Sequence, residues 1–267
     1  MLLPLFVSIL AVLPAAAQNP PIAERINISS SRKEAALGAR IAEEVRTRKK
    51  LLASVAAREY VEGLGREIEV LLPKGGPGYT FECLAGSGSI LREPSVLPGG
   101  YIFVPAGLFL AAESESEFVG MLAHSMAHSA ARHGMASRGQ AGNSGRAPLL
   151  FTIPWDGLHG TEMSAPLGLL PLMRAYEEEA DRIAVRTMAR AGYDPTALFR
   201  YIERMQVGER LISDSSRPSR EARVAGLQQA VAELSPSQYA SGTGKFERIR
   251  ALVSALMQQA PPAPSLR

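Results

Sequence analysis

The chain has 267 residues, of which 46% are hydrophobic, and its 29 basic residues nearly balance its 26 acidic ones. This length is enough for one substantial hydrophobic core, and a net charge of +3 gives no indication of a nucleic-acid partner. The single cysteine, Cys83, excludes an intramolecular disulfide framework. Because it lies in an apolar strand pattern, we interpret it as a small core residue.

Residues 1–17 are set apart by a nearly continuous apolar run that ends in three alanines. The run is too short to cross a bilayer as a helix, and small residues at its end are typical of a signal-peptide cleavage site. We therefore predict a signal peptide cut after Ala17 and a secreted or periplasmic protein. A buried N-terminal helix or an uncleaved anchor is the alternative.

The rest of the chain divides into a leader at 18–31, one domain at 32–258 and a flexible, proline-containing tail at 259–267. Within the domain, apolar residues recur at helical spacing across 32–72, which predicts two amphipathic helices or one bent helix. Periodicity and flanking glycine or proline predict further helices at 175–190, 195–205, 220–234 and 245–257.

Two short stretches have the composition of β-strands. Residues 79–84 form one, and Tyr101, Ile102, Phe103 and Val104 form the other. We expect the second strand to be an edge along which an extended substrate peptide adds by main-chain pairing. The predicted fold is α+β and mainly helical, with a small antiparallel sheet beside the helix that carries the motif described below.

Residues 135–171 form the least regular part of the chain, and apolar stretches lie within 148–172. A connection of this length is usually functional or without fixed structure. It is either a hydrophobic packing loop or helical hairpin, or a lid over the site that contacts a membrane surface.

A helix is predicted to begin at Ser114, where an S-x-x-E capping box starts, and to end near Gly134. It carries His124 and His128, which lie one turn apart on the same helix face. Two imidazoles in this arrangement can hold one zinc ion. In the H-E-x-x-H form of this motif the glutamate is the general base of a metallopeptidase, but here Ser125 stands in its place.

A catalytic zinc site needs a third protein ligand, and its fourth position is left to water. One standard pattern places a third histidine six residues after His128, where this chain has Gly134. The other pattern takes a carboxylate from a later helix, and the acidic run at 177–181 supplies candidates. If the two histidines are instead buried core residues, this run is a solvated helix face.

In combination, five stretches resemble the gluzincin peptidases related to HtpX, Oma and the CAAX prenyl protease, at residues 97–104, 111–117, 124–133, 177–182 and 191–195. The resemblance covers roughly residues 37–257 and implies a zincin-like metallopeptidase domain that uses zinc. It also implies that the third zinc ligand is the glutamate four residues before the aspartate of the A-D pair, which is Glu177.

Glu177 and Asp181 lie four residues apart, so both are expected to face the helix that carries the histidines. We expect Asp181 to accept the outer N–H of a zinc-bound imidazole, which fixes the tautomer and raises the basicity of that ligand. Glu178 and Glu179 are expected to face elsewhere. His133 is out of phase with the histidine pair, and we interpret it as a structural or surface residue.

The chain departs from the family pattern at three positions near the expected metal. Ser125 replaces the general base, Arg217 stands before Pro218 where the family often has histidine, and Pro94-Ser95 replaces Asn-Ala. A hydroxyl without an adjacent base cannot take a proton from zinc-bound water near neutral pH, and general-base catalysis is worth about 10² to 10⁴ in rate. The departures lie at the chemical site, whereas the sequence features of the scaffold are intact.

The sequence is therefore compatible with two principal functions. The first is a zinc metalloendopeptidase of the cell envelope whose hydrolysis is weak because of Ser125. The second is a non-catalytic, zinc-binding pseudopeptidase that binds unfolded or misassembled envelope proteins. A metal-free structural domain is a third possibility, and measurements of metal content and turnover separate the three.

Overall fold

The computed structural model describes residues 31–73, 77–85, 92–133, 170–205, 218–239, 242 and 244–259. The predicted signal peptide, nearly all of the leader, residues 134–169, Arg217 and residues 260–267 lie outside this part of the chain. No helix within the described ranges is long and apolar enough to cross a membrane.

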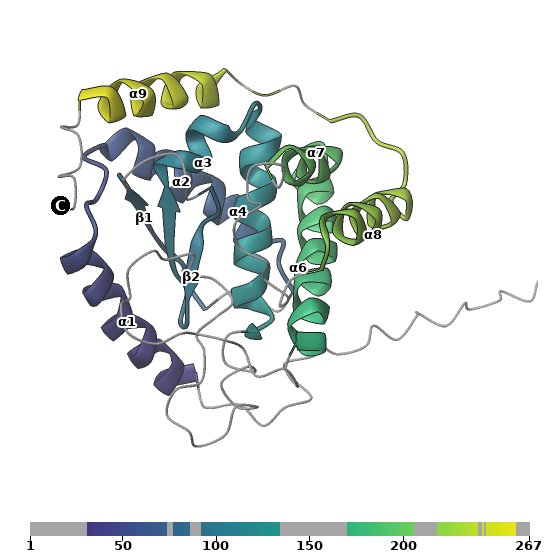
Figure 1. Ribbon diagram of the computed structural model, residues 1–267, viewed down its shortest axis with the longest axis horizontal. Coiled ribbons are helices and arrows are strands. Elements are labelled where there is room, and N and C mark those ends of the chain that lie inside the picture. The colour runs from purple at the N-terminus through teal and green to yellow at the C-terminus, as the bar shows by residue number, and fades with distance from the viewer. Residues whose placement is uncertain are drawn as a thin grey trace, which may run out of the picture.

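Two amphipathic helices open the described chain, as the periodicity predicts. Helix α1 spans Ser31–Arg48 and α2 spans Val55–Glu69. The side chain of Ser54 accepts a hydrogen bond from the Ala57 N–H and so caps the start of α2. Helix α1 lies on the outside of the molecule against two strands of the sheet, while α2 packs against the third strand and against the helix that carries the histidines (Figure 1).

The sheet has three strands, β1 (Thr80–Leu84), β2 (Ser95–Leu97) and β3 (Tyr101–Pro105), in the order β1-β3-β2. Strands β2 and β3 form an antiparallel hairpin, and Gly99 in its turn has a φ of 77°. After this hairpin, β3 inserts between β2 and β1 and therefore runs parallel to β1. The sheet is mixed, so the prediction of a purely antiparallel sheet is wrong.

The predicted edge strand is also wrong, because Tyr101, Ile102, Phe103 and Val104 lie in β3, the middle strand of the sheet. Hydrogen bonds to β1 on one side and to β2 on the other occupy both of its main-chain edges. A substrate peptide cannot add to β3, and the outer strands are β1 and β2. The sequence did not reveal this because β2 has only three residues.

Helix α4 (Glu115–Ala130), which follows the short helix α3 (Ala106–Ala111), is the centre of the fold. Figure 1 shows α4 between the sheet and helix α6. Its residues from Glu115 to His128 are all buried, as in a helix surrounded by packed elements. The side chain of Ser114 caps the helix, as predicted, by accepting the Glu117 N–H at 3.2 Å.

Helix α4 ends before the predicted position at Gly134. Its C-cap is Ala131, and the next residue, Arg132, has a left-handed φ of 56°, which costs about 1–2 kcal/mol for a residue other than glycine. The guanidinium of Arg132 is held by Glu34 of α1, with Nε 2.8 Å from Oε2. After this turn, His133 lies beside His128, with the Nδ1 atoms of the two rings 3.0 Å apart.

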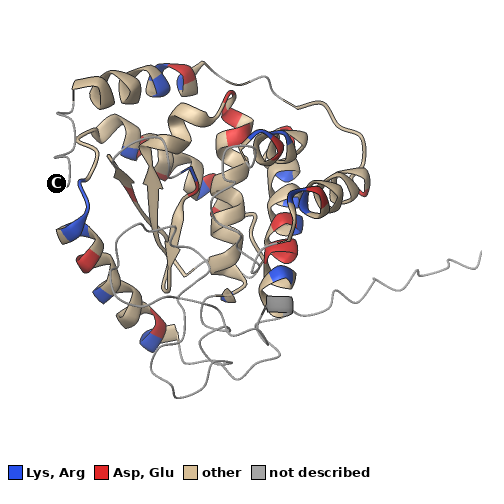
Figure 2. Ribbon diagram, viewed as in Figure 1, with Lys and Arg blue, Asp and Glu red and all other residues tan. Residues whose placement is uncertain are grey.

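The remaining described helices agree with those predicted from periodicity. They are α6 (Leu170–Arg190), α7 (Thr196–Met205), α8 (Arg220–Ala232) and α9 (Lys245–Gln259). Gly192, with a φ of 83°, follows the end of α6. Acidic and basic residues lie along α6 and α8, whereas α4 carries them only in its first turn (Figure 2).

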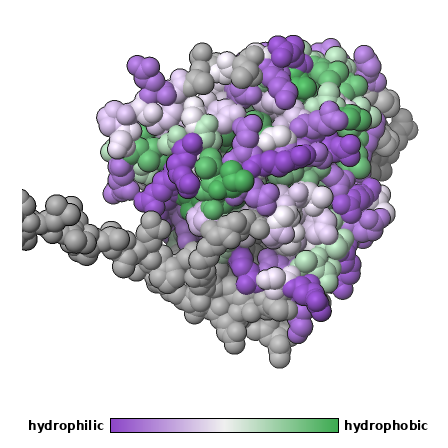
Figure 3. Space-filling model, turned by 180° about the vertical axis from the view of Figure 1, so that it is seen from behind, coloured by the Kyte–Doolittle hydropathy of each residue, from purple (hydrophilic) through white to green (hydrophobic). Residues whose placement is uncertain are grey.

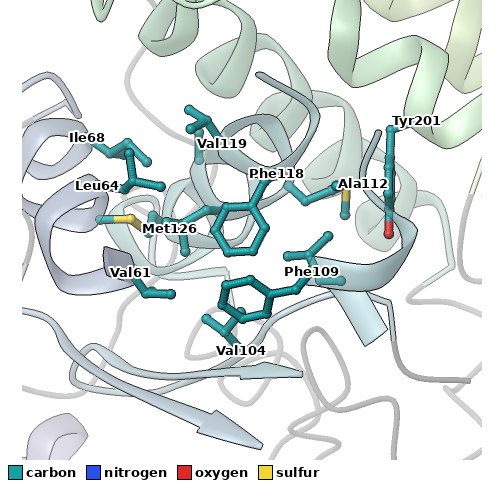
Figure 4. Packing of buried hydrophobic residues seen from close by; sticks show 14 of the residues in the cluster. Val61, Leu64, Ile68, Val104, Phe109, Ala112, Phe118, Val119, Met126 and Tyr201 are labelled. Carbon is teal, nitrogen blue, oxygen red and sulfur yellow. The ribbon is translucent and has the colours of Figure 1, made fainter. Parts of the chain in front are cut away.

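The hydrophobic core lies between α2, the sheet and α4, and Figure 4 shows its centre. The rings of Phe109 and Phe118 meet there with their centroids 4.6 Å apart, and Val104 of β3 and Met126 of α4 lie beside them. The surface of the face seen in Figure 3 is a mosaic of hydrophilic and hydrophobic patches. The structure thus confirms a mainly helical α+β fold around one buried helix.

Candidate metal centre

Two packed helices bring together three side chains with metal-binding atoms. His124 and His128 lie one turn apart on α4, and Glu177 lies on α6, which runs alongside α4. His124 Nε2 is 3.1 Å from His128 Nε2 and 3.7 Å from Glu177 Oε2. His128 Nε2 is 3.4 Å from Glu177 Oε1. The three residues predicted as metal ligands therefore converge on one point, and all three are buried.

The spacing and the chemistry of these atoms fit a zinc ion. Zinc bonds of about 2.0–2.2 Å at tetrahedral angles place ligand atoms roughly 3.3–3.6 Å apart, and the three distances of 3.1, 3.4 and 3.7 Å are close to this range. Glu177 Oε2 is buried and has no hydrogen-bond partner among the described residues, and a buried carboxylate oxygen is costly without one. Two imidazoles and one glutamate are also the ligand set of a class of catalytic zinc sites.

Asp181 lies where the sequence places it, behind the first histidine ligand. Its Oδ1 is 2.8 Å from His124 Nδ1, on the side of the imidazole that faces away from Glu177. A carboxylate in this position holds the proton on Nδ1 and so leaves Nε2 unprotonated, which a metal ligand requires. The tautomer and orientation of His124 are thereby set by the protein itself.

Arg223 of α8 is a central residue of the site that sequence reasoning missed. Its guanidinium makes a two-pronged contact with Asp181, with Nε 2.8 Å from Oδ2 and Nη2 2.9 Å from Oδ1. Nη2 also lies 3.2 Å from His124 Nε2 and 3.8 Å from Glu177 Oε2. A buried cation thus contacts two residues of the metal centre and its supporting carboxylate.

The opposite charges of Asp181 and Arg223 shift the pKa of both side chains. Burial disfavours the charged form of Asp181, but Arg223 and His124 outweigh it and hold the pKa of the carboxyl well below its usual value. Burial likewise opposes the charge of Arg223, and Asp181 reverses that effect and raises the pKa of the guanidinium. Helical spacing could have identified Arg223, because it shares the buried face of α8 with Leu227 and Ala230.

Ser125, at the position of the general base, is buried and directed at the backbone of the segment before β2. Its hydroxyl donates a hydrogen bond to the Pro94 carbonyl oxygen at 3.3 Å. A carbonyl oxygen is not a base near neutral pH, so this contact gives the hydroxyl no means to accept a proton from water.

The structure excludes a surface position for His133 and corrects the position of Glu179. His133 is completely buried, and its Nδ1 is 3.0 Å from Nδ1 of His128. Glu179 faces His133, with Oε2 3.2 Å from Nε2, so the prediction that it faces elsewhere is wrong. Glu178 is exposed, as predicted. The helical phase of His133 was misleading because α4 ends at Ala130 and the chain turns back.

Comparison with known proteins places the chain in a family. Residues 95–255, more than half of the chain, match the model of peptidase family M48, and the chain belongs to this family. It is 27% identical over 218 residues to a putative beta-barrel assembly-enhancing protease of Vibrio cholerae, covering 72% of this chain and 43% of the relative.

Two further relatives carry the name mitochondrial metalloendopeptidase OMA1. The protein of Schizosaccharomyces pombe is 30% identical over 161 residues, which cover 54% of this chain and 46% of the relative. The protein of Arabidopsis thaliana is 31% identical over 195 residues, which cover 69% of this chain and 36% of the relative. In each of these three relatives, the matched part is less than half of the whole protein.

Proposed function

We propose that this chain is a zinc-binding, metallopeptidase-family protein of the cell envelope that hydrolyses peptide bonds weakly. The observation that carries the proposal is the retained set of buried ligand atoms on His124, His128 and Glu177 beside a serine at the general-base position. The metal centre is intact in its ligands, and the group that would take the proton is missing.

Each residue of the site has a defined part in this proposal. His124 and His128 hold the metal through Nε2, and Glu177 supplies the third ligand atom. When bound, zinc polarises the scissile carbonyl and lowers the pKa of its water ligand toward about 7. Asp181 orients His124. With Ser125 in place of a general base, the rate lacks a factor of about 10² to 10⁴, so slow turnover remains.

The second candidate is a pseudopeptidase that binds unfolded or misassembled envelope proteins without cutting them. The hydrogen bond from Ser125 to the Pro94 carbonyl favours it, because the hydroxyl donates its proton to a backbone oxygen, which is not a base near neutral pH. Export rests on the apolar run that ends at Ala17, and contact with a membrane surface rests on the apolar stretches in 148–172. Mass spectrometry of the mature protein should give a chain that starts after Ala17, and one that retains Met1 contradicts the envelope assignment.

Metal analysis tests the first part of the proposal. We expect close to one zinc ion per chain in the parent, lost in His124→Ala and in Glu177→Ala. Glu178→Ala is the matched control, because Glu178 is the exposed neighbour of the proposed ligand. No zinc in the parent, or equal loss in all three variants, would leave the two histidines as buried core residues.

Proteolysis of a denatured protein substrate, with and without a chelator, separates the two candidate functions. If the missing base is the main defect, Ser125→Glu should raise cleavage by about 10² or more, and adding Arg217→His should raise it further. Ser129→Glu, one turn further along α4, controls for the added charge. A parent that already cleaves as fast as Ser125→Glu in a chelator-sensitive manner rules out the pseudopeptidase. No chelator-sensitive cleavage by any variant favours it.

A further inference from the structure

His128, the second of the proposed histidine ligands, has its own series of hydrogen-bond partners, and the family comparison assigns no role to them. His128 Nε2 faces Glu177 and the other ligand histidine, while its Nδ1 is turned toward His133. We propose that His133 and Glu179 form a positioning pair that fixes the tautomer and ring orientation of His128 for metal binding. This inference rests on the zinc site proposed above.

One arrangement of protons is consistent with the two contacts of His133. A metal ligand at Nε2 of His128 requires the proton of that ring to be on Nδ1. That N–H can donate to Nδ1 of His133, 3.0 Å away, provided that His133 carries its own proton on Nε2. The Nε2 proton of His133 then points at Oε2 of Glu179, at 3.2 Å. The chain of hydrogen bonds therefore begins at the metal ligand and ends on a carboxylate.

Three contacts from different parts of the fold hold His133 in this position. The left-handed turn at Arg132, anchored to Glu34 of α1, brings the ring beside His128. Tyr176 of α6 stacks on the ring, with centroids 4.3 Å apart and an interplanar angle of 18°. Glu179, one turn further along α6, accepts at the far nitrogen. The side chain of Glu179 is 14% exposed, so the series of hydrogen bonds ends close to solvent.

The two ligand histidines are thus supported in different ways. His124 contacts the carboxylate of Asp181 directly at 2.8 Å. The Nδ1 atom of His128 instead faces the imidazole of His133, whose other nitrogen faces the carboxylate of Glu179. Outer partners of metal ligands typically contribute 10- to 100-fold to metal affinity, so loss of either member of the pair should have a measurable effect on zinc binding.

The test is the zinc dissociation constant of the full chain, measured by competition with a chromophoric chelator. Glu179→Gln and His133→Phe should each weaken zinc binding by about 10- to 100-fold. Glu178→Gln, the adjacent exposed carboxylate, should leave it unchanged. His133→Asn should retain more affinity than His133→Phe, because its amide oxygen can accept the Nδ1 proton of His128. The visible spectrum of the Co²⁺-substituted protein should change in the same order.

A double variant distinguishes positioning from a general loss of stability. If Glu179 acts through His133, adding Glu179→Gln to His133→Phe should cause little further loss of zinc affinity, whereas independent effects multiply. Unfolding of the metal-free proteins is measured in parallel to show whether each variant is folded. If His133→Phe is misfolded, its zinc affinity is set aside and the result for Glu179→Gln decides. If the parent, Glu179→Gln and folded His133→Phe bind zinc with equal affinity, the positioning pair is refuted and the proposed zinc site is not. A parent that binds no zinc overturns both the pair and the proposed site.

Discussion

Replacing Arg223 with methionine should destabilise the protein strongly at neutral pH. The guanidinium is buried, and it neutralises Asp181 through two short contacts. Removing one partner of such a pair leaves an uncompensated buried charge, which costs about 3–5 kcal/mol. For a urea m-value of about 3 kcal/mol/M, the midpoint of unfolding should fall by roughly 1–2 M.

The loss should depend on pH in a defined direction. In the parent, the depressed pKa of Asp181 means that its contribution is complete above the carboxyl pKa of the unfolded chain, about 3.9, and is lost as the pH falls through the folded value. In Arg223→Met the carboxyl has lost its cation, so burial favours protonation and acid relieves the penalty. The difference between variant and parent should therefore be greatest near pH 7 and shrink as the pH approaches 4.

The control is Arg220→Met, the same substitution one turn earlier on α8, where the side chain is 38% exposed and pairs with Glu221. Surface changes of this kind cost less than about 0.5 kcal/mol. Urea unfolding of the metal-free proteins at several pH values is the assay. Arg223→Met with as small a cost as Arg220→Met, or with a cost that does not change with pH, would refute the role given to the buried pair.

Three further outcomes follow from the packing and the charges. Gly65→Ala should destabilise the protein by about 1–3 kcal/mol in thermal unfolding, because its new Cβ would lie 2.1 Å from Phe81 Cζ. Gly63→Ala in the same helix is the control, since its Cβ would meet nothing within 4 Å, and it should stabilise the protein by up to about 1 kcal/mol. Burial raises the pKa of Cys83 to about 12, so this thiol should react with a thiol reagent at pH 8 only as fast as the protein unfolds, and fast labelling of the native protein would contradict it. Glu177→Gln should have opposite effects on stability with and without zinc.

The long helices and the group of candidate metal ligands could be predicted from sequence because both depend on spacing within one helix. His124 and His128 on α4 are four residues apart, as are Glu177 and Asp181 on α6. Such pairs share a helix face wherever the helix packs. The family resemblance then identified which carboxylate of the acidic run faces the histidines.

The features that could not be predicted depend on how separate elements meet. Strand β2 has three residues and α3 has six, too few for a periodic pattern. The insertion of β3 between β1 and β2 is a long-range pairing that local sequence does not specify. The position of His133 depends on the end of α4 and on a left-handed turn at a non-glycine residue, which sequence patterns do not predict.

The balance of buried charge explains why Glu177→Gln should act in opposite directions. With neutral imidazoles, the centre holds two carboxylates, Glu177 and Asp181, against one cation, Arg223, so one negative charge is left over. Glu177 Oε2 also has no hydrogen-bond partner among the described residues. In metal-free protein, Glu177→Gln removes that excess charge, and unfolding should become no easier or somewhat harder.

Zinc reverses the sign of the effect. At the proposed site a divalent ion would use the charge of Glu177, and it would stabilise the folded state by about 2.7 kcal/mol when its free concentration is 100 times the dissociation constant. Glu177→Gln weakens that binding and forfeits this stabilisation, so the variant should unfold at a lower temperature than the parent in saturating zinc. Glu178→Gln, on the exposed side of α6, should behave like the parent in both conditions. Thermal unfolding with zinc and with chelator gives the comparison, and a change of the same sign in both would mean that Glu177 is not held in place for a metal.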